Sequence, residues 1–220
     1  ARDVTTKFTS RGLKNTMIMK EHIESAIKNS VGHVALFFPS YMMQEKILEE
    51  RSWIPWGIET IVERRMMSKD LVAKSVERLH NYRNKNQRCI LIGVLGGKFS
   101  EGVDYPDNIL ETVICVGLPL APPSARQDAL KSYYEARFGN ILSWRYTSSQ
   151  PAVNSLMQAI GRPIRKSEDR ALIILLENRL LNRNYRLCMP DSLQITQTSN
   201  PDRTKKFTKS FFQHYPKPGI

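Results

Sequence analysis

The sequence predicts a doubly wound α/β domain, with a mainly parallel sheet of about five strands and helices on both faces. Two observations support this fold class. Short apolar runs alternate along the chain with longer segments whose apolar residues recur at helical spacing. Three of the apolar runs are nearly continuous in Val, Ile and Leu, a pattern typical of strands that are buried on both faces of a parallel sheet.

The expected elements follow in a regular order, from an entry segment at 1–13 through a domain at 14–198 to a basic tail at 199–220. Strands are expected at 33–40, 58–63, 89–96, 111–119 and 170–177. Helical patterns occupy 15–30, 41–50, 69–84, 123–139 and 150–166, and the tail has an amphipathic helical pattern at 204–215. We expect the entry segment to come from something upstream.

The formal net charge of +12 favours a polyanionic partner, because a cationic surface releases the counterions of nucleic acid. Basicity that serves only solubility is the alternative. No apolar run approaches the roughly 20 residues that span a bilayer, so no membrane partner is expected. Cys89, Cys115 and Cys188 form no CxxC pair and the histidines are scattered, so we expect no metal site and a reducing compartment.

The stretch at 93–107, "GVLGGKFSEGVDYPD", superficially resembles a phosphate-binding loop. That loop has the pattern G-x-x-x-x-G-K-[ST], but the first glycine position holds Ile92 and the residue after Lys98 is Phe99. No acidic box that could hold Mg²⁺ ends a buried strand. The chain is therefore not expected to hydrolyse a nucleotide alone. A glycine-rich turn after a parallel strand still lies where α/β folds bind ligands, beside Ser100, Glu101 and Asp104.

A second segment, "QAIGRPIRK" at 158–166, places two arginines near that turn. Gln158 and Arg162 are four residues apart, and Gly161 leaves room for close approach. Pro163 disrupts the helix because it lacks an amide hydrogen. Arg162 and Arg165 form a suitable fork for phosphate oxygens, although surface arginines at a helix end are the plain alternative.

Four blocks of sequence together resemble a known family. "GGKFSEGVDYPD" is similar to motif V, and "QAIGRPIR" to motif VI, of superfamily 2 helicases of the XPD group, which includes the DinG enzymes. "ALFFPSY" at 35–41 is similar to motif IV, and "GLPLAPPS" at 117–124 to the proline-rich segment that follows motif V. The resemblance covers roughly residues 5–185 and implies the second, RecA-like motor domain of a DNA helicase.

The resemblance implies that ATP and Mg²⁺ lie between this domain and a first motor domain that is not in the sequence. Arg165 is then the expected arginine finger, with Arg162 beside it and Gln158 positioning water or coupling the nucleotide to the cleft. Gly102, Asp104 and Glu101 are the expected ATP-side residues. An iron–sulfur cluster is compatible with the parent protein but not with this chain, and the compartment would be the cytoplasm of a prokaryote or the nucleus of a eukaryote.

The expected single-stranded DNA track crosses the other side of the cleft. Ser40 and Tyr41 offer a phosphate contact and a stacking face, and Lys98 and Ser100 contact the backbone. The segment 131–146 interleaves aromatic and basic residues, a composition suited to single strands. Its expected contacts are Tyr133, Arg137, Trp144 and Arg145.

The family implies 5′-to-3′ movement and a role in DNA repair. Two alternatives stay open at this point: half of an RNA helicase, and a catalytically silent RecA-like module that only binds nucleic acid or protein.

Overall fold

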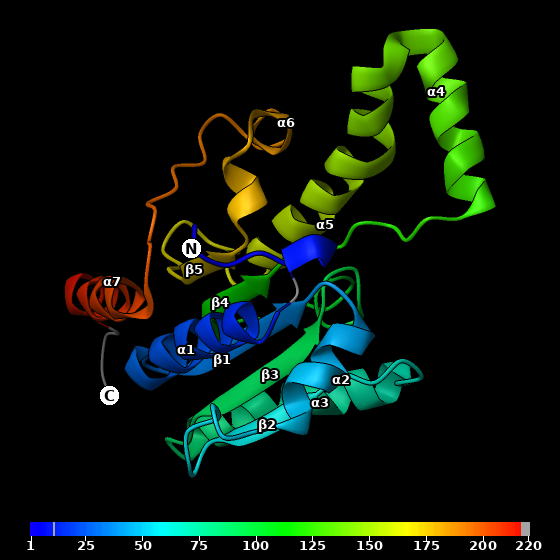
Figure 1. Ribbon diagram of the computed structural model, residues 1–220. Coiled ribbons are helices and arrows are strands. Elements are labelled where there is room, and N and C mark those ends of the chain that lie inside the picture. Colours follow the sequence, from blue (N-terminus) through cyan, green and yellow to red (C-terminus); the bar gives the residue numbers. More distant parts are fainter. Residues whose placement is uncertain (11, 217–220) are drawn as a thin grey trace.

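A computed structural model describes residues 1–10 and 12–216, in which five strands form one parallel sheet of order β2-β3-β1-β4-β5 (Figure 1). The strands are β1 His33–Phe38, β2 Glu59–Val62, β3 Cys89–Val94, β4 Leu110–Val116 and β5 Leu172–Leu176. Four lie within a segment expected to be a strand, β4 starts one residue before its expected range, and the α/β fold with helices on both faces is confirmed.

Helices connect and cover the strands. They are α1 Leu13–Asn29, α2 Tyr41–Glu49, α3 Lys69–Asn84, α4 Ala125–Trp144, α5 Gln150–Ile160, α6 Arg183–Arg186 and α7 Pro201–His214, with short helical turns η1 Phe8–Ser10, η2 Arg145–Ser149 and η3 Asn178–Leu181. Serine side chains cap three of them: Ser40, Ser68 and Ser124 each accept a backbone N–H from the first turn of α2, α3 and α4. Such caps satisfy amides that have no partner within the helix.

Two apolar cores lie on opposite faces of the sheet, because successive strand residues point to opposite sides. Ala35 and Phe37 of β1 pack on the side of α3 and α5. Leu36 and Phe38 pack on the side of α1 and α2. The domain therefore has three layers, and the connections that leave the carboxyl ends of the strands gather along one edge of the sheet.

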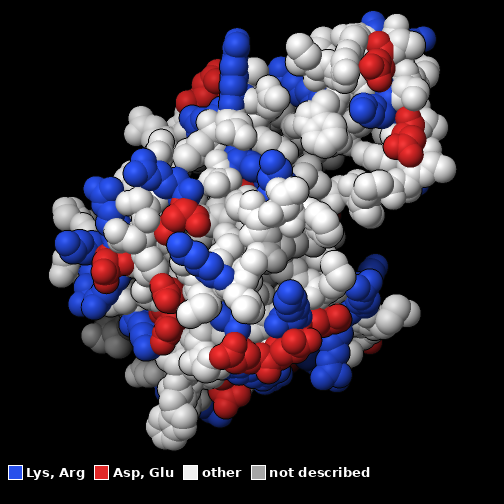
Figure 2. All heavy atoms as spheres, viewed as in Figure 1, with Lys and Arg blue, Asp and Glu red and all other residues white. Residues whose placement is uncertain are grey.

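A helical hairpin stands out from this three-layer body (Figure 1). Its two arms are parts of α4, which turns at Gly139, where φ is 78°. The second arm runs on through η2 into α5, and Ser143 Oγ joins the arms by donating a 2.7 Å hydrogen bond to the Lys131 carbonyl. Figure 2 shows the hairpin as a separate lobe with an open notch beside it, and Lys and Arg are spread over this face rather than gathered in one patch.

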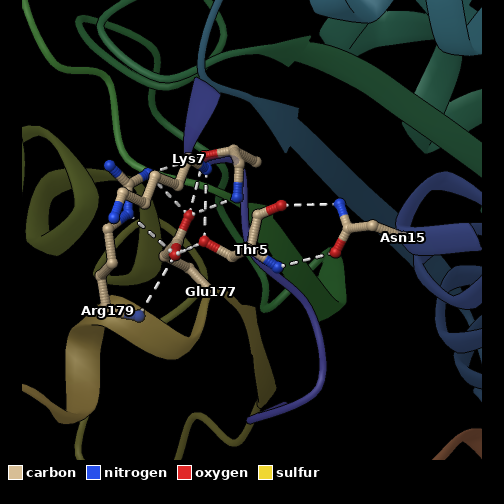
Figure 3. A network of polar contacts seen from close by, with 6 residues as sticks. Thr5, Lys7, Asn15, Glu177 and Arg179 are labelled. Atoms are coloured by element: carbon tan, nitrogen blue, oxygen red, sulfur yellow. Dashed lines mark hydrogen bonds and ion pairs between the residues drawn. The ribbon is translucent and has the colours of Figure 1, made fainter. Parts of the chain in front are cut away.

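The segment before α1 and the helix α7 pack onto the domain. The buried carboxylate of Glu177, directly after β5, accepts hydrogen bonds from the hydroxyls of Thr5 and Thr6 and from the guanidinium of Arg179 (Figure 3). Helix α7 packs against α1. Residues 217–220, the end of the expected tail, lie outside the described residues. Among the helices of the described residues, none has the length and apolar character needed to cross a membrane.

Candidate functional site

The candidate site lies at the carboxyl ends of β1, β2 and β3. Ser40 and Tyr41 follow β1, Glu63 follows β2, and the glycine-rich segment 95–104 follows β3. In a parallel sheet these ends share one edge, which is where α/β folds bind ligands. The loop and the strand ends are therefore brought together by the topology of the sheet.

The glycine-rich turn encloses a carboxylate of the protein itself. Glu63 is 1% exposed, and its Oε1 accepts a 2.7 Å hydrogen bond from the Lys98 amide. Its Oε2 accepts longer bonds from the amides of Phe99, at 3.3 Å, and Val94, at 3.4 Å. These three amides are therefore occupied by Glu63 and do not face a ligand.

This carboxylate also explains two of the glycines. A β-carbon on Gly97 would lie 2.5 Å from Glu63 Oε1, and one on Gly93 would lie 2.6 Å from Oε2. Both distances are shorter than any stable contact between a β-carbon and an oxygen. The glycines of the sequence "GVLGG" thus make room for the buried side chain of Glu63.

Arg162 forms hydrogen bonds with the C-terminal part of the same loop. It lies two residues beyond the end of α5, and its Nε donates a 2.7 Å hydrogen bond to the Ser100 carbonyl. Its Nη1 donates a 3.1 Å bond to the Val103 carbonyl. The guanidinium is half-buried and bound to main-chain oxygens, so Arg162 joins the segment after α5 to the loop after β3.

Arg165 forms a second, looser link between the same two segments. Its Nη2 lies 2.8 Å from Oδ1 of Asp104, and the two side chains are 43% and 73% exposed. The remaining nucleotide-side candidates lie around this pair: Gln158 is exposed on α5, Gly102 is exposed with a φ of 75°, and Glu101 is half-buried. The structure thus brings the two motif segments into direct contact.

Tyr41 is the link between β1 and this loop. Its hydroxyl donates a 2.7 Å hydrogen bond to Oε1 of Glu63, and the Arg65 guanidinium lies 5.1 Å from the centre of its ring. Burial and the adjacent Glu63 carboxylate raise the pKa of the Tyr41 phenol. Ser40 uses its Oγ to cap α2, and Lys98 is exposed with its Nζ donating to the Met67 carbonyl.

The prediction that the Ser100 side chain contacts DNA requires a correction. Its side chain is fully buried, its Oγ donates to the Val94 carbonyl at 2.8 Å, and it accepts the Gly97 amide at 3.0 Å. The hydroxyl is therefore out of reach of a bound strand in this conformation. It closes the turn after β3 instead of contacting DNA.

The segment 131–146 forms much of the hairpin rather than a flat groove. Tyr134, Phe138 and Tyr146 form an aromatic cluster between the two arms, with ring centres 5.7 to 5.9 Å apart. Of the expected contact residues, Tyr133 and Trp144 are exposed. Arg137 lies over the Tyr133 ring at 5.0 Å from its centre, and Arg145 is half-buried and donates to the Leu187 carbonyl.

Glu63 is the residue that the motifs did not identify. The sequence places it at the end of an expected strand, followed by two arginines, a setting typical of a solvated strand end. The available signal was its position in the fold, since a carboxylate at the end of one parallel strand lies next to the glycine-rich turn after another.

The family model described as "Helicase C-terminal domain" matches residues 23–196. The chain belongs to this family. It is 37% identical over 105 residues to the ATP-dependent DNA helicase DinG of Photobacterium profundum, covering 47% of this chain and 15% of that protein. It is 30% identical over 167 residues to the ATP-dependent DNA helicase CHL1 of Kluyveromyces lactis, covering 68% of this chain and 20% of that protein.

The structural comparison gives the same fold. A solved XPD helicase aligns with a TM-score of 0.68 at 24% identity, over 86% of this chain and 32% of that one. The chain is thus a helicase C-terminal domain of the XPD/DinG type in superfamily 2. It spans 15 to 20% of the length of the two relatives above.

Proposed function

We propose that this helicase C-terminal domain is the second motor domain of an ATP-dependent DNA helicase, with residues 14–198 as the RecA-like unit. ATP would lie between it and a first motor domain. The observation that carries the proposal is the direct contact of motifs V and VI through Asp104–Arg165 and through Arg162 with the loop carbonyls. This contact holds two arginines at the strand-end edge of the sheet.

The two arginines have different proposed roles. Arg162 is half-buried and makes two main-chain hydrogen bonds, so it serves to hold the loop. Arg165 is held by an exposed ion pair, and such pairs contribute only about 0–1 kcal/mol. Arg165 can therefore leave Asp104 for a phosphate at little cost, which suits an arginine finger that stabilises charge on the transferred phosphoryl group. Gln158, Glu101 and Gly102 complete the proposed nucleotide side.

The Mg²⁺ that ATP chemistry requires would be held elsewhere. Among residues 1–10 and 12–216, no three His, Cys, Asp or Glu side chains form a group that could hold a metal ion. Asp104, an exposed carboxylate of the glycine-rich segment, is paired with Arg165. Because the sequence lacks both the G-x-x-x-x-G-K-[ST] pattern and an acidic box at the end of a buried strand, we assign the phosphate-binding loop and the Mg²⁺ ligands to the first motor domain, and we expect the 220-residue chain alone to be inactive.

The cysteines of this chain do not fit an iron–sulfur cluster. Cys89, Cys115 and Cys188 are buried, free and distributed between two strands and the segment after α6. Burial raises the pKa of Cys89 to about 12, which disfavours the thiolate that such a cluster needs. Any cluster in the parent protein would use other residues.

The proposed single-stranded DNA track includes Tyr41, Lys98 and the exposed side of the hairpin. Tyr133, Arg137 and Trp144 combine stacking faces with positive charge, which is the combination that binds single strands without sequence preference. Movement in the 5′-to-3′ direction and a function in DNA repair belong to the same proposal through the resemblance to XPD-group helicases.

The test is ATP hydrolysis by the full-length protein with Arg165→Ala. We expect DNA-stimulated turnover to fall by about 10³-fold or more, with nucleotide binding retained. The exposed neighbour Lys166, replaced by Ala, is the matched control and should leave turnover close to wild type. Unchanged turnover in Arg165→Ala would remove the finger assignment, and an inactive wild-type protein would remove the enzyme proposal.

A further inference from the structure

The buried carboxylate of Glu63 connects the proposed DNA track with the loop that carries Asp104. On one side it accepts the Tyr41 hydroxyl at 2.7 Å, and on the other it accepts the Lys98 and Phe99 amides. Tyr41 belongs to the proposed DNA track, and the amides belong to the loop that carries Asp104. One side chain thus bridges the two.

The environment of Glu63 makes these hydrogen bonds essential. A carboxylate that is 1% exposed has lost its water, and a buried charge is tolerated only where donors replace that water. Oε1 is shared by Tyr41 and the Lys98 amide. A change in the position of the Tyr41 hydroxyl therefore changes the acceptor available to the loop.

The loop has little conformational freedom to accommodate such a change. Phe99 is fully buried, its amide faces Glu63, and its carbonyl accepts a 2.9 Å hydrogen bond from the buried hydroxyl of Tyr105. Gly93 and Gly97 fit closely around the carboxylate. Five residues beyond Phe99 the chain reaches Asp104, the partner of Arg165.

Tyr41 is placed so that a ligand bound to its ring would alter the hydrogen bond from its hydroxyl to Glu63. The ring is half-buried, Arg65 lies over it, and its hydroxyl donates to Glu63. A base stacked on Tyr41, or a phosphate that draws Arg65 away, would shift the ring and its hydroxyl together.

We propose that Glu63 is a positioning residue through which single-stranded DNA on Tyr41 sets the conformation of the 97–104 loop and, through it, of Arg165. This inference rests on the proposed function, because it needs a strand at Tyr41 and a nucleotide at Arg165. Glu63 itself touches neither ligand.

The experiment follows the Phe99 amide by NMR in the 220-residue chain at saturating oligothymidylate. Phe99 is fully buried, so a strand cannot touch it directly. We expect DNA to shift the Phe99 amide resonance in the wild-type chain, and the shift to be lost in Tyr41→Phe, which keeps the ring and removes only the hydroxyl. Glu63→Gln is the complementary variant, because it changes the acceptor of the same hydrogen bond. Tyr82→Phe, on α3, removes a hydroxyl that is bonded to Arg78 and should retain the shift.

The outcomes separate the two proposals. If the wild-type chain binds the oligonucleotide but the Phe99 resonance does not move, or moves equally in Tyr41→Phe, the positioning role is wrong while the DNA track stands. If no single-stranded DNA binds, the proposed track fails and the positioning role fails with it. Full-length Tyr41→Phe should also show a stimulated kcat about tenfold lower at saturating DNA, as expected for loss of a hydrogen bond to a charged group.

Discussion

The Nε of Arg162 donates a 2.7 Å hydrogen bond to the main-chain oxygen of Ser100, so the segment after α5 is bonded directly to the loop after β3. Together with the bond to the Val103 carbonyl, this contact joins the two segments that carry Asp104 and Arg165. A helix end and a strand-end loop that are about 60 residues apart in the chain thus act as one structural unit.

Arg162→Ala should lower the free energy of unfolding by about 2–3 kcal/mol, because two hydrogen bonds from a charged group are lost and half-buried carbonyls are left without them. Arg162→Lys should recover less than half, since an ammonium lacks the planar fork. Urea denaturation measures both. Arg126→Ala, exposed on α4, is the control, and a similar loss in that variant would contradict the specific role of Arg162.

Gly97→Ala should destabilise the domain by about 1–3 kcal/mol, because the added β-carbon would meet Glu63 Oε1 at 2.5 Å and Val94 Cγ2 at 2.6 Å. Gly12→Ala is the matched control, since nothing lies within 4 Å of a β-carbon there. Thermal unfolding of the two variants gives the comparison. Equal melting temperatures would mean that the loop moves to accept the methyl group.

Trp144→Ala should weaken the binding of single-stranded DNA about tenfold, which corresponds to the loss of about one stacked base. Trp56→Ala is the control, because Trp56 is fully exposed but lies outside the hairpin, in the segment before β2. Fluorescence anisotropy at several salt concentrations measures the affinity. Arg137→Ala should in addition reduce the salt slope by about 0.7, as expected for one phosphate contact on a single strand.

The buried ring of His22 should make stability depend on pH. Its Nδ1 lies 2.8 Å from Thr204 Oγ1 on α7, and its Nε2 faces the Asp3 carboxylate. Burial lowers the pKa of His22, against the opposing effect of Asp3 and of Glu21, and the N-terminal ammonium of Ala1 lowers it further. The unfolded chain therefore binds the proton more readily than the folded one, so stability is present above about pH 6.5 and is lost as the pH falls through the lower folded pKa.

His22→Gln should remove this component of the pH dependence. Urea midpoints at about pH 7.5 and pH 5 measure it, a range in which aspartates stay largely ionised. His80→Gln, on α3, should retain the wild-type difference. A difference that survives in His22→Gln would assign the pH dependence to another group.

The strands could be predicted because their apolar runs carry the signal themselves. β1, β3 and β4 are buried at every position, so their residues are apolar almost without interruption, and β1, β3 and β4 fall within the expected ranges or start one residue earlier. The helices were predicted from apolar residues that recur at helical spacing along the chain. These are local properties, and a single sequence displays them.

The site was only partly predictable, because its contacts join residues far apart in the chain. The sequence indicated that Arg162 and Arg165 approach the loop, but not that Arg162 bonds to carbonyls while Arg165 pairs with Asp104. Ser100 appeared suited to a phosphate, yet a small hydroxyl is equally suited to close a buried turn. Only the three-dimensional arrangement distinguishes these alternatives.

The hairpin has a mechanical consequence. The arm of α4 from Ala125 to Phe138 extends for about 20 Å, given a rise of about 1.5 Å per helical residue. Its base joins the body through the segment 117–124 and through η2, which runs into α5, and α5 leads straight to Arg162. A rotation of α5 by about ten degrees would move the tip by about 3.5 Å over an arm of this length. The hairpin thus converts a small rotation of α5 into a displacement of several ångströms at its tip.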